Sequence, residues 1–253
     1  MQMCKRCQRV ISLLVIFTIT NKMLTAQMTG IVKYEAGLSA GVFIYQGDLV
    51  PSDLGSYRTP KPAFAISGSR ILNRSFAFRA NLAIGGLRGD ESKYSHPDYR
   101  QERNFAFKAT AIELSGQLVW NPLGRNYEDK GLTPYLFAGV GASYIYTRRD
   151  WSRLNVDYFA ENSEIIPGLA IDVAHSSSKI IPVIPLGIGL RYALTPSISI
   201  NTETSYRATF TDYIDGISYA ANPDKRDHYH SHTVGIIYRF GRKNTLDCPV
   251  VRP

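Results

Sequence analysis

Apolar and polar residues alternate along most of the chain after Lys33, with a period of two rather than the 3.6 of a helix. In the segment 197–210, the even positions hold isoleucine, threonine, alanine and aromatic residues, while the odd positions hold serine, asparagine, glutamate, threonine and arginine. Such alternation is typical of strands with one apolar and one polar face. Eight segments are predicted to be strands: 33–45, 62–71, 75–87, 105–120, 133–147, 181–194, 197–210 and 229–240.

The lengths of these segments and of their connections indicate a membrane barrel rather than a soluble sheet. Most segments have about 10–14 residues, more than the usual strand of a soluble protein but suited to a tilted membrane crossing. Long and short connections alternate, as they do in outer-membrane barrels, which have periplasmic turns and long exterior loops. The loops are 46–61, 88–104, 148–180 and 211–228, and the turns are 72–74, 121–132 and 195–196. We therefore expect an all-β fold, an eight-stranded antiparallel transmembrane β-barrel located in the bacterial outer membrane.

Residues 1–26 have the features of a cleaved signal peptide. Basic residues precede an apolar run from Val10 to Ile19, and Ala26 supplies a small residue at the expected cleavage point. Removal of this segment takes four basic residues with it and lowers the net charge from +8 to +4, a modest value that does not indicate a nucleic-acid partner. We expect residues 27–240 to form the barrel and residues 241–253 to form a C-terminal tail in the periplasm.

The polar faces of the predicted strands carry three acidic residues and four arginines that the barrel would enclose. These residues are Glu35, Arg79, Glu113, Arg191, Glu203, Arg207 and Arg239. An eight-stranded barrel has an interior just wide enough for its own side chains, and an unpaired charge there is costly. We expect arginine–carboxylate pairs that plug the barrel instead of lining a pore, with Glu113 approaching an arginine of another strand.

Two further expectations concern small and aromatic residues. Inward glycines are expected to make room for the long arginine side chains; they are Gly139, Gly141, Gly187, Gly189 and Gly235. Aromatic residues near strand ends are expected at the two membrane interfaces, where a ring can be apolar while its tip meets water. They include Tyr45, Trp120, Tyr144, Tyr146, Tyr192, Tyr206, Tyr238 and Phe240.

Motifs that would indicate catalysis or a cofactor are missing from the sequence. It contains no G-x-S-x-G, H-E-x-x-H, P-loop or complete G-x-G-x-x-G motif, and no C-x-x-C remains after residue 26. His228, His230 and His232 alternate and would share one face of a strand, which makes them weak candidates for a metal site, although polar residues at a barrel rim explain them more simply. We therefore expect no enzyme activity, no cofactor and no small-molecule substrate.

Four segments resemble the PorG-like family of small outer-membrane barrels, a component of the type IX secretion system. They are Tyr45-Gln46-Gly47-Asp48-Leu49, the stretch from Ile112 to Pro122, Thr133-Pro134-Tyr135-Leu136-Phe137-Ala138-Gly139-Val140-Gly141, and Thr211-Asp212-Tyr213-Ile214-Asp215-Gly216-Ile217-Ser218. The third run also resembles barrels of the OmpA type, and the expected barrel has the size of those of OmpA and OmpX. The last segment is the more specific one.

The resemblance implies a non-enzymatic accessory barrel that anchors periplasmic ring components of the secretion machinery to the outer membrane. The turn 121–132 and the tail 241–253 would then contact the partner, while outer-membrane lipid surrounds the barrel. The alternative is a stand-alone surface barrel, an adhesin or an OmpX-like structural protein, that acts through its exterior loops. Cys248, the only cysteine after residue 26, is either an idle thiol or forms a disulfide with a ring component.

Overall fold

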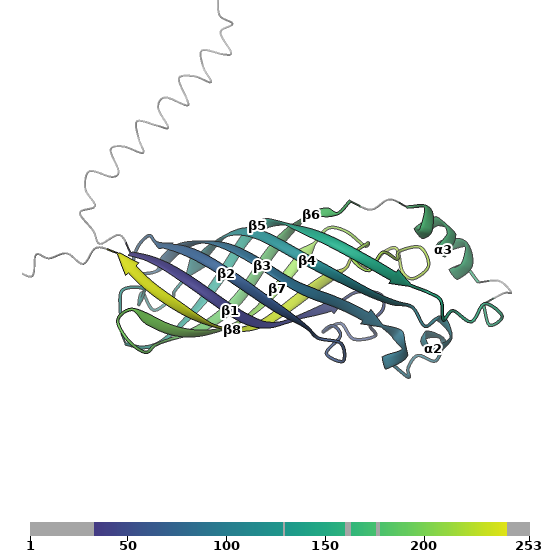
Figure 1. Cartoon of the computed structure of the whole chain (residues 1–253), viewed down its shortest axis with the longest axis horizontal. Coiled ribbons are helices and arrows are strands. Elements are labelled where there is room, and N and C mark those ends of the chain that lie inside the picture. The colour runs from purple at the N-terminus through teal and green to yellow at the C-terminus, as the bar shows by residue number, and fades with distance from the viewer. Residues whose placement is uncertain (1–32, 129, 160–162, 176–177, 242–253) are drawn as a thin grey trace, which may run out of the picture. The chain divides into compact units, whose positions relative to one another are not determined.

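The computed structural model describes residues 33–241 except 129, 160–162 and 176–177. Eight antiparallel strands form a closed barrel in which each strand pairs with its neighbours in the chain and β8 lies beside β1 (Figure 1). The strands are β1 (Lys33–Gln46), β2 (Lys61–Ile71), β3 (Phe76–Asp90), β4 (Ala106–Trp120), β5 (Gly131–Asp150), β6 (Ile180–Ala193), β7 (Ile198–Thr209) and β8 (His228–Gly241). The predicted fold class is confirmed.

Strand boundaries agree with the predicted ones to within three residues. The largest differences are at the loop ends of β3 and β5, which each continue three residues beyond the predicted strand. Asp90 and Asp150 pair there with Ala106, on either side of β4. The period-two pattern becomes polar at this point, but the backbone ladder continues, because ladder hydrogen bonds do not depend on the side chain.

The outward face of the barrel is apolar over a band that matches the thickness of a membrane. Leu114 and Val140 are 63% and 70% exposed, and a surface of such residues is unfavourable in water. Ten residues of β4 separate Trp120 from Thr110, about 33 Å of strand, which a tilt of about 40° reduces to about 25 Å along the membrane normal. This outer-membrane type of barrel therefore crosses the bilayer with its strands.

Three short turns occupy one end of the barrel and four long loops the other; we call these the turn end and the loop end. Side-chain oxygens stabilise the turns: Asn73 Oδ1 accepts hydrogen bonds from the backbone N–H groups of Ser75 and Phe76 at 2.8 Å, a common turn arrangement. By the rule for outer-membrane barrels, the turn end faces the periplasm and the loop end the exterior.

The long loops contain short helices and fold over the loop end of the barrel. The helices are the 3₁₀ helix η1 (Glu91–Lys93) and the α-helices α2 (Tyr99–Arg103) and α3 (Ile165–Ala174) (Figure 1). None of the described helices is long and apolar enough to cross a membrane. Apolar side chains of the loops, such as Leu49 and Ile217, form one buried cluster with Phe43 and Phe107 of the strands.

One expected interfacial aromatic residue is in the interior instead. Tyr45 is fully buried at the loop end of β1, whereas Trp120, Tyr144, Tyr146, Tyr192, Tyr238 and Phe240 are all exposed on the outer wall. Alternation places Tyr45 on the same face of β1 as Glu35, which the sequence already assigned to the interior. The prediction for Tyr45 was wrong because the period of two, and not the distance from a strand end, decides which face of the strand a residue occupies.

Candidate functional site

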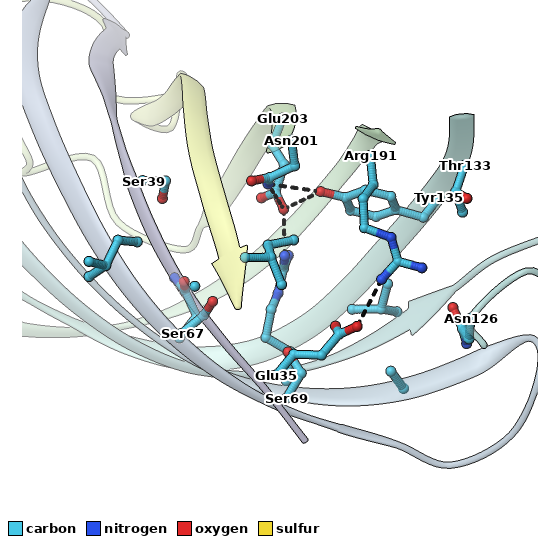
Figure 2. A pocket seen from close by; sticks show the side chains of 17 residues that line it. Glu35, Ser39, Ser67, Ser69, Asn126, Thr133, Tyr135, Arg191, Asn201 and Glu203 are labelled. Carbon is cyan, nitrogen blue, oxygen red and sulfur yellow. Dashed lines mark hydrogen bonds and ion pairs between the residues drawn. The ribbon is translucent and has the colours of Figure 1, made fainter. Parts of the chain in front are cut away.

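The turn half of the interior contains a network of charged and polar side chains, which we call the turn-end network. It consists of Glu35, Arg79, Tyr135, Arg191, Asn201, Glu203 and Arg239. Figure 2 shows Arg191 reaching Glu35, whose Oε1 atom lies 2.9 Å from Arg191 Nη1. The same oxygen lies 3.3 Å from Arg239 Nε. Glu35 therefore neutralises part of the charge of two arginines on different strands.

Glu203 is the second centre of this network. Its Oε1 atom accepts hydrogen bonds from Arg79 at 2.5 Å and from the Tyr135 hydroxyl at 2.6 Å. Arg79 also donates from Nε to Gln117 at 2.7 Å, and its guanidinium lies 4.4 Å from the centre of the Phe137 ring. Since several groups fix each partner, the ion pair has one preferred geometry, as a buried pair requires.

A second charged group lies nearer the middle of the barrel. Glu113 is fully buried and accepts hydrogen bonds from Arg207 at 3.0 Å and from the Tyr229 hydroxyl at 3.1 Å. Arg207 also donates to the hydroxyl groups of Ser205 and Ser231. The contact joins strands β4 and β7 across the interior. Glu203 and Arg207, four residues apart on β7, do not pair with each other, because each points to a partner on another strand.

The structure therefore places all seven charged residues singled out in the sequence inside the barrel. Each of the three acids contacts an arginine from a different strand. The paired residues are far apart in the sequence, by up to 204 residues for Glu35 and Arg239. Alternation predicts which face a residue occupies, whereas the pairing depends on tilt and register, which the sequence pattern does not specify.

A polar pocket lies within the turn-end network, between the arginines and the turn that follows β4. Figure 2 shows Glu35, Ser69 and Asn126 around it, with Arg191 above Glu35. Its volume is about 50 Å³, enough for about three or four water molecules. Arg79 and Glu203 line both this pocket and a further void of about 20 Å³ deeper in the barrel, so their ion pair separates the two spaces.

The inward glycines lie against groups other than arginines, which corrects the prediction, and two of them make room for aromatic rings. A Cβ atom on Gly187 would lie 2.4 Å from the Phe137 ring, and one on Gly189 would lie 2.2 Å from the Tyr135 ring. The register explains this, because each of these glycines is directly opposite the aromatic residue on the neighbouring strand. Gly139, Gly141 and Gly235 instead lie against the polar residues Gln117, Ser115 and Asn201.

At the loop end the first and last loops are joined by a buried cluster, which we call the loop cap. It consists of Tyr45, Asp48, Asp212, Asp215 and Asp227. The Tyr45 hydroxyl lies 2.7 Å from Asp215 and 2.6 Å from Asp227. Gly47 permits this approach, since a Cβ atom there would lie 1.9 Å from the Asp227 carboxylate.

The geometry of the loop cap requires an extra proton. A phenol has one hydrogen to donate, so both short contacts of Tyr45 are hydrogen bonds only if one carboxyl group donates as well. Asp227 accepts from the backbone N–H groups of Ile214 and Asp215 at 2.8 and 3.3 Å. The Asp215 carboxyl accepts one such bond, from Ile217 at 2.8 Å. The proton therefore fits best on Asp215, while Asp227 remains the acceptor.

Burial raises the pKa values of the cap carboxyls, which is the direction that this arrangement needs. It raises the pKa of Asp215 and Asp227 well above the usual range, and repulsion from Asp227 raises the pKa of Asp215 further. Burial likewise raises the pKa of Asp48 to about 6 and that of Asp212 to about 7. The cap is thus a group of carboxyls that share protons instead of pairing with cations.

Two other buried acids hold the loops in place: Asp172 joins two loops, and Glu91 fixes the loop between β3 and β4, from which Arg103 donates to the carbonyl of Ala220. Asp172 of α3 accepts hydrogen bonds from the backbone N–H groups of Ser218, Tyr219 and Ala220 at 2.9–3.1 Å. Glu91 is fully buried and lies 2.5 Å from Arg103 and 3.0 Å from Arg100. These contacts hold four separate loop segments in one arrangement. Sequence reasoning missed them, because loop residues carry no periodic signal.

The three alternating histidines share the outer face of β8, as expected, but each ring has its own partner. His228 Nδ1 accepts from the backbone N–H of Thr209, His230 Nε2 lies 2.7 Å from Gln46, and His232 Nε2 lies 2.9 Å from the Tyr57 hydroxyl. Within the described residues, no group of three or more His, Cys, Asp or Glu side chains is placed to hold a metal ion.

Some predictions fall outside the described residues. These are the signal peptide at 1–26, the tail after Gly241 and Cys248 within it. The turn at the end of β4 is described except for residue 129, and its segment 121–128 folds back on the barrel: Asn126 donates from Nδ2 to the backbone carbonyl of Asn73 at 3.0 Å. This turn therefore presents a defined surface at the turn end.

Comparisons with known proteins give relatives in structure but no curated relative in sequence: no curated protein matches this chain. Ail of Yersinia pestis is 12% identical with a TM-score of 0.46, over 83% of this chain and 100% of that chain. OprG of Pseudomonas aeruginosa is 10% identical with a TM-score of 0.44, over 84% and 97%. Neisserial surface protein A is 17% identical with a TM-score of 0.41, over 82% and 97%.

The family assignment comes from the sequence as a whole. Residues 8–248 match a family described as a domain of unknown function, DUF6089. The match covers all eight strands and both of the loops that build the loop cap. The protein therefore belongs to the DUF6089 family.

Proposed function

We propose that the protein is a non-enzymatic outer-membrane barrel that anchors periplasmic ring components of the type IX secretion machinery. The observation that carries the proposal is the difference between the barrel's two ends. The loops fold into a buried cap at the exterior end, whereas a pocket and an ordered turn lie at the periplasmic end. A binding role at the periplasmic end fits this arrangement better than conduction or exterior chemistry.

The state of the interior charges supports a structural role over catalysis. Every acid of the turn-end network and Glu113 is engaged by an arginine, and Arg79 is closely surrounded. A catalytic acid or base needs access to a substrate and a pKa matched to its task. Acids that pair with arginine across the barrel instead stabilise the closed wall.

The link to type IX secretion rests on the resemblance of four segments. Two of them, 45–49 and 211–218, lie far apart in the sequence but contact each other through Tyr45 and Asp215 in the loop cap. A third contains Tyr135 and Phe137, which line the interior around Arg79 and Glu203. These three segments therefore contribute contacts to the interior and to the loop cap, and the experiments below test for the partner.

Purification from membranes in mild detergent, followed by mass spectrometry, tests the anchor. Leu123, 53% exposed in the turn after β4, and Leu54, 72% exposed in the first loop, form a matched pair at opposite ends. We expect Leu123→Glu to lose the ring components and to reduce secretion, while Leu54→Glu keeps both. The opposite result, with loss of an exterior ligand in Leu54→Glu only, would favour the stand-alone surface barrel.

The tail offers a second test of the same proposal. If Cys248 forms a disulfide with a ring component, non-reducing gels of whole cells will show a larger species that disappears on reduction and in Cys248→Ser. A single monomer band under both conditions, with normal secretion in the variant, would instead identify Cys248 as an idle thiol.

A further inference from the structure

Three basic residues form a row across the outer wall near the loop end. Arg88 of β3 is directly opposite Lys108 of β4, and Lys108 is directly opposite Arg148 of β5. All three are on the outward face, since alternation along β4 and β5 places Lys108 and Arg148 on the same side as the exposed Ile112 and Tyr146. We call this set the basic row.

Like charges directly opposite each other on neighbouring strands repel, and a sheet normally avoids them. Arg88 is neutralised by Asp90, at 2.7 Å. Arg148 lies over the Tyr146 ring at 5.5 Å, but within the described part of the chain neither it nor Lys108 takes part in an ion pair. Two adjacent positive charges of the row therefore lack a counterion among the described residues.

The surroundings increase the positive charge. The basic row lines a hollow of about 410 Å³ together with Arg149 and Arg153. Two acids also line it, but Asp90 is held by Arg88 and Arg153, and Asp150 by the Ser152 hydroxyl at 2.7 Å. Arg149 is directed elsewhere, because its Nη1 atom donates to the backbone carbonyls of Asp172 and Gly216. Four basic side chains therefore face two acids, which leaves an excess of positive charge. The site suits an anion with several oxygens, which arginine binds in bidentate fashion.

The height of the row identifies the neighbour that can supply this anion. Lys108 is twelve residues from Trp120 along β4, about 40 Å of strand and about 30 Å along the membrane normal, compared with an apolar band of about 25 Å. The row therefore lies just beyond the apolar band on the exterior side. Because it faces away from the barrel axis, a lipid headgroup of the outer leaflet is directly beside it.

We propose that the basic row and its hollow bind the phosphate groups of an anionic outer-leaflet lipid. The inference is independent of the proposed anchoring role, which concerns the opposite end of the barrel. Free phosphate shares the relevant chemistry, but the outward position at headgroup height favours the lipid. In the outer leaflet of a bacterial outer membrane, phosphorylated lipid A has the required charge.

Binding of lipid A to the purified full-length barrel tests the proposal. Native mass spectrometry would compare bisphosphorylated lipid A with its dephosphorylated form for the wild type and for Lys108→Gln/Arg148→Gln. At about fivefold per charge near a membrane surface, we expect the double variant to bind about thirtyfold more weakly. Arg70→Gln/Arg74→Gln, which removes two exposed basic residues at the turn end, is the matched control and keeps wild-type binding.

Stability gives a readout that a general loss of folding would not reproduce. In neutral detergent, Lys108→Gln/Arg148→Gln relieves repulsion and raises the melting temperature, whereas with lipid A present it lowers it relative to the wild type. Three results would overturn the proposal: equal weakening in the Arg70→Gln/Arg74→Gln control, equal binding of dephosphorylated lipid A, or displacement of lipid A by millimolar inorganic phosphate, which would identify a soluble anion site.

Discussion

The two halves of the barrel interior compensate buried acids in different ways. In the turn half, Glu35 and Glu203 each face an arginine from another strand. In the loop cap, Asp215 and Asp227 face a phenol, backbone N–H groups and each other. The acids of the turn half are stabilised by opposite charge, whereas the acids of the loop cap are stabilised by shared protons. The comparison teaches that equal burial does not imply equal response to pH, because only the cap depends on protons that alkaline conditions remove.

Breaking an arginine pair should have the largest effect. Glu203→Ala leaves Arg79 buried without its acidic partner, so we expect a loss of about 3–5 kcal/mol in the free energy of unfolding. Replacing Arg79 by Met in the same protein should recover much of this loss, because it removes the unpaired charge. Urea unfolding followed by fluorescence measures both.

The same variant tests the plug. Because Arg207 and Glu113 remain in place beyond the Arg79–Glu203 pair, Glu203→Ala should lower stability without opening conductance. Planar-bilayer recordings check this. Stable single-channel currents from the wild-type protein would show that the interior conducts, and the pairs would then be a selectivity element instead of a plug.

Removing the bridging hydroxyl of the cap should have an intermediate effect. Tyr45→Phe leaves Asp215 and Asp227 without their shared partner, at a cost of about 1–3 kcal/mol. Because the cap lies in the loops, we expect faster proteolysis of the loops with an intact barrel. Tyr57→Phe, whose ring is 57% exposed, is the control. Equal protection of the loops in both variants would mean that the apolar cluster alone holds the cap.

A pH series should give a smaller, graded change that sharpens the comparison. The pKa of Asp48 is about 6 and that of Asp212 about 7 in the folded protein, above the usual 3.8, so the folded cap binds more protons than the unfolded chain between these values. This stabilisation is fully present below pH 3.8 and is lost as the pH rises through 6 and 7. Loop proteolysis should therefore accelerate severalfold from pH 5 to pH 8.

The control for the pH series lies in the same molecule. The protection factors for amide hydrogen exchange in β7 and β8, which are corrected for the base-catalysed intrinsic rate, should change much less with pH over this range, because opposite charges compensate the acids there. Asp48→Asn should remove the part of the loop response near pH 6. Protection factors that change equally in strands and loops would contradict the distinction between the two halves.

Cysteine labelling on intact cells perturbs the structure least and fixes which half faces outward. In a Cys248→Ser background, cysteines at Tyr57 and Asp224, both exposed in loops, should react with an impermeant reagent, whereas one at Leu123 should not. Arg100, a natural choice from its place in a long loop, is unsuitable because it is buried against Glu91. Labelling at Leu123 alone would show that the turn end, and not the loop end, faces the exterior.

The strands and the interior acids could be predicted from the sequence because both follow the period of two. Glu113 and Arg207 alternate with lipid-facing residues, so their inward direction needs no structure. The partner of each could not be predicted, since it depends on the tilt and register of the closed barrel. Glu203 lies four residues from Arg207 but binds Arg79, which is 124 residues away.

The loop cap lay beyond sequence reasoning for a different reason. Asp48 and Asp227 are far apart in the sequence, with most of the strands between them, and they follow no period. In the sequence, each resembles an ordinary exposed acid of a loop. The available signal was the resemblance of the segments 45–49 and 211–218 to one family. A resemblance does not show which segments touch, and only the structure places Tyr45 beside Asp215.

The chain positions of the cap residues bear on how the barrel assembles. Tyr45 belongs to the first strand, and Asp227, 182 residues later, directly precedes the last. A partly inserted sheet, in which β1 has not yet met β8, cannot bring these two residues together. Such distant contacts form late in folding. Protection of the loops from protease should therefore appear only when the first and last strands pair. The time at which protection appears then measures when the barrel closes.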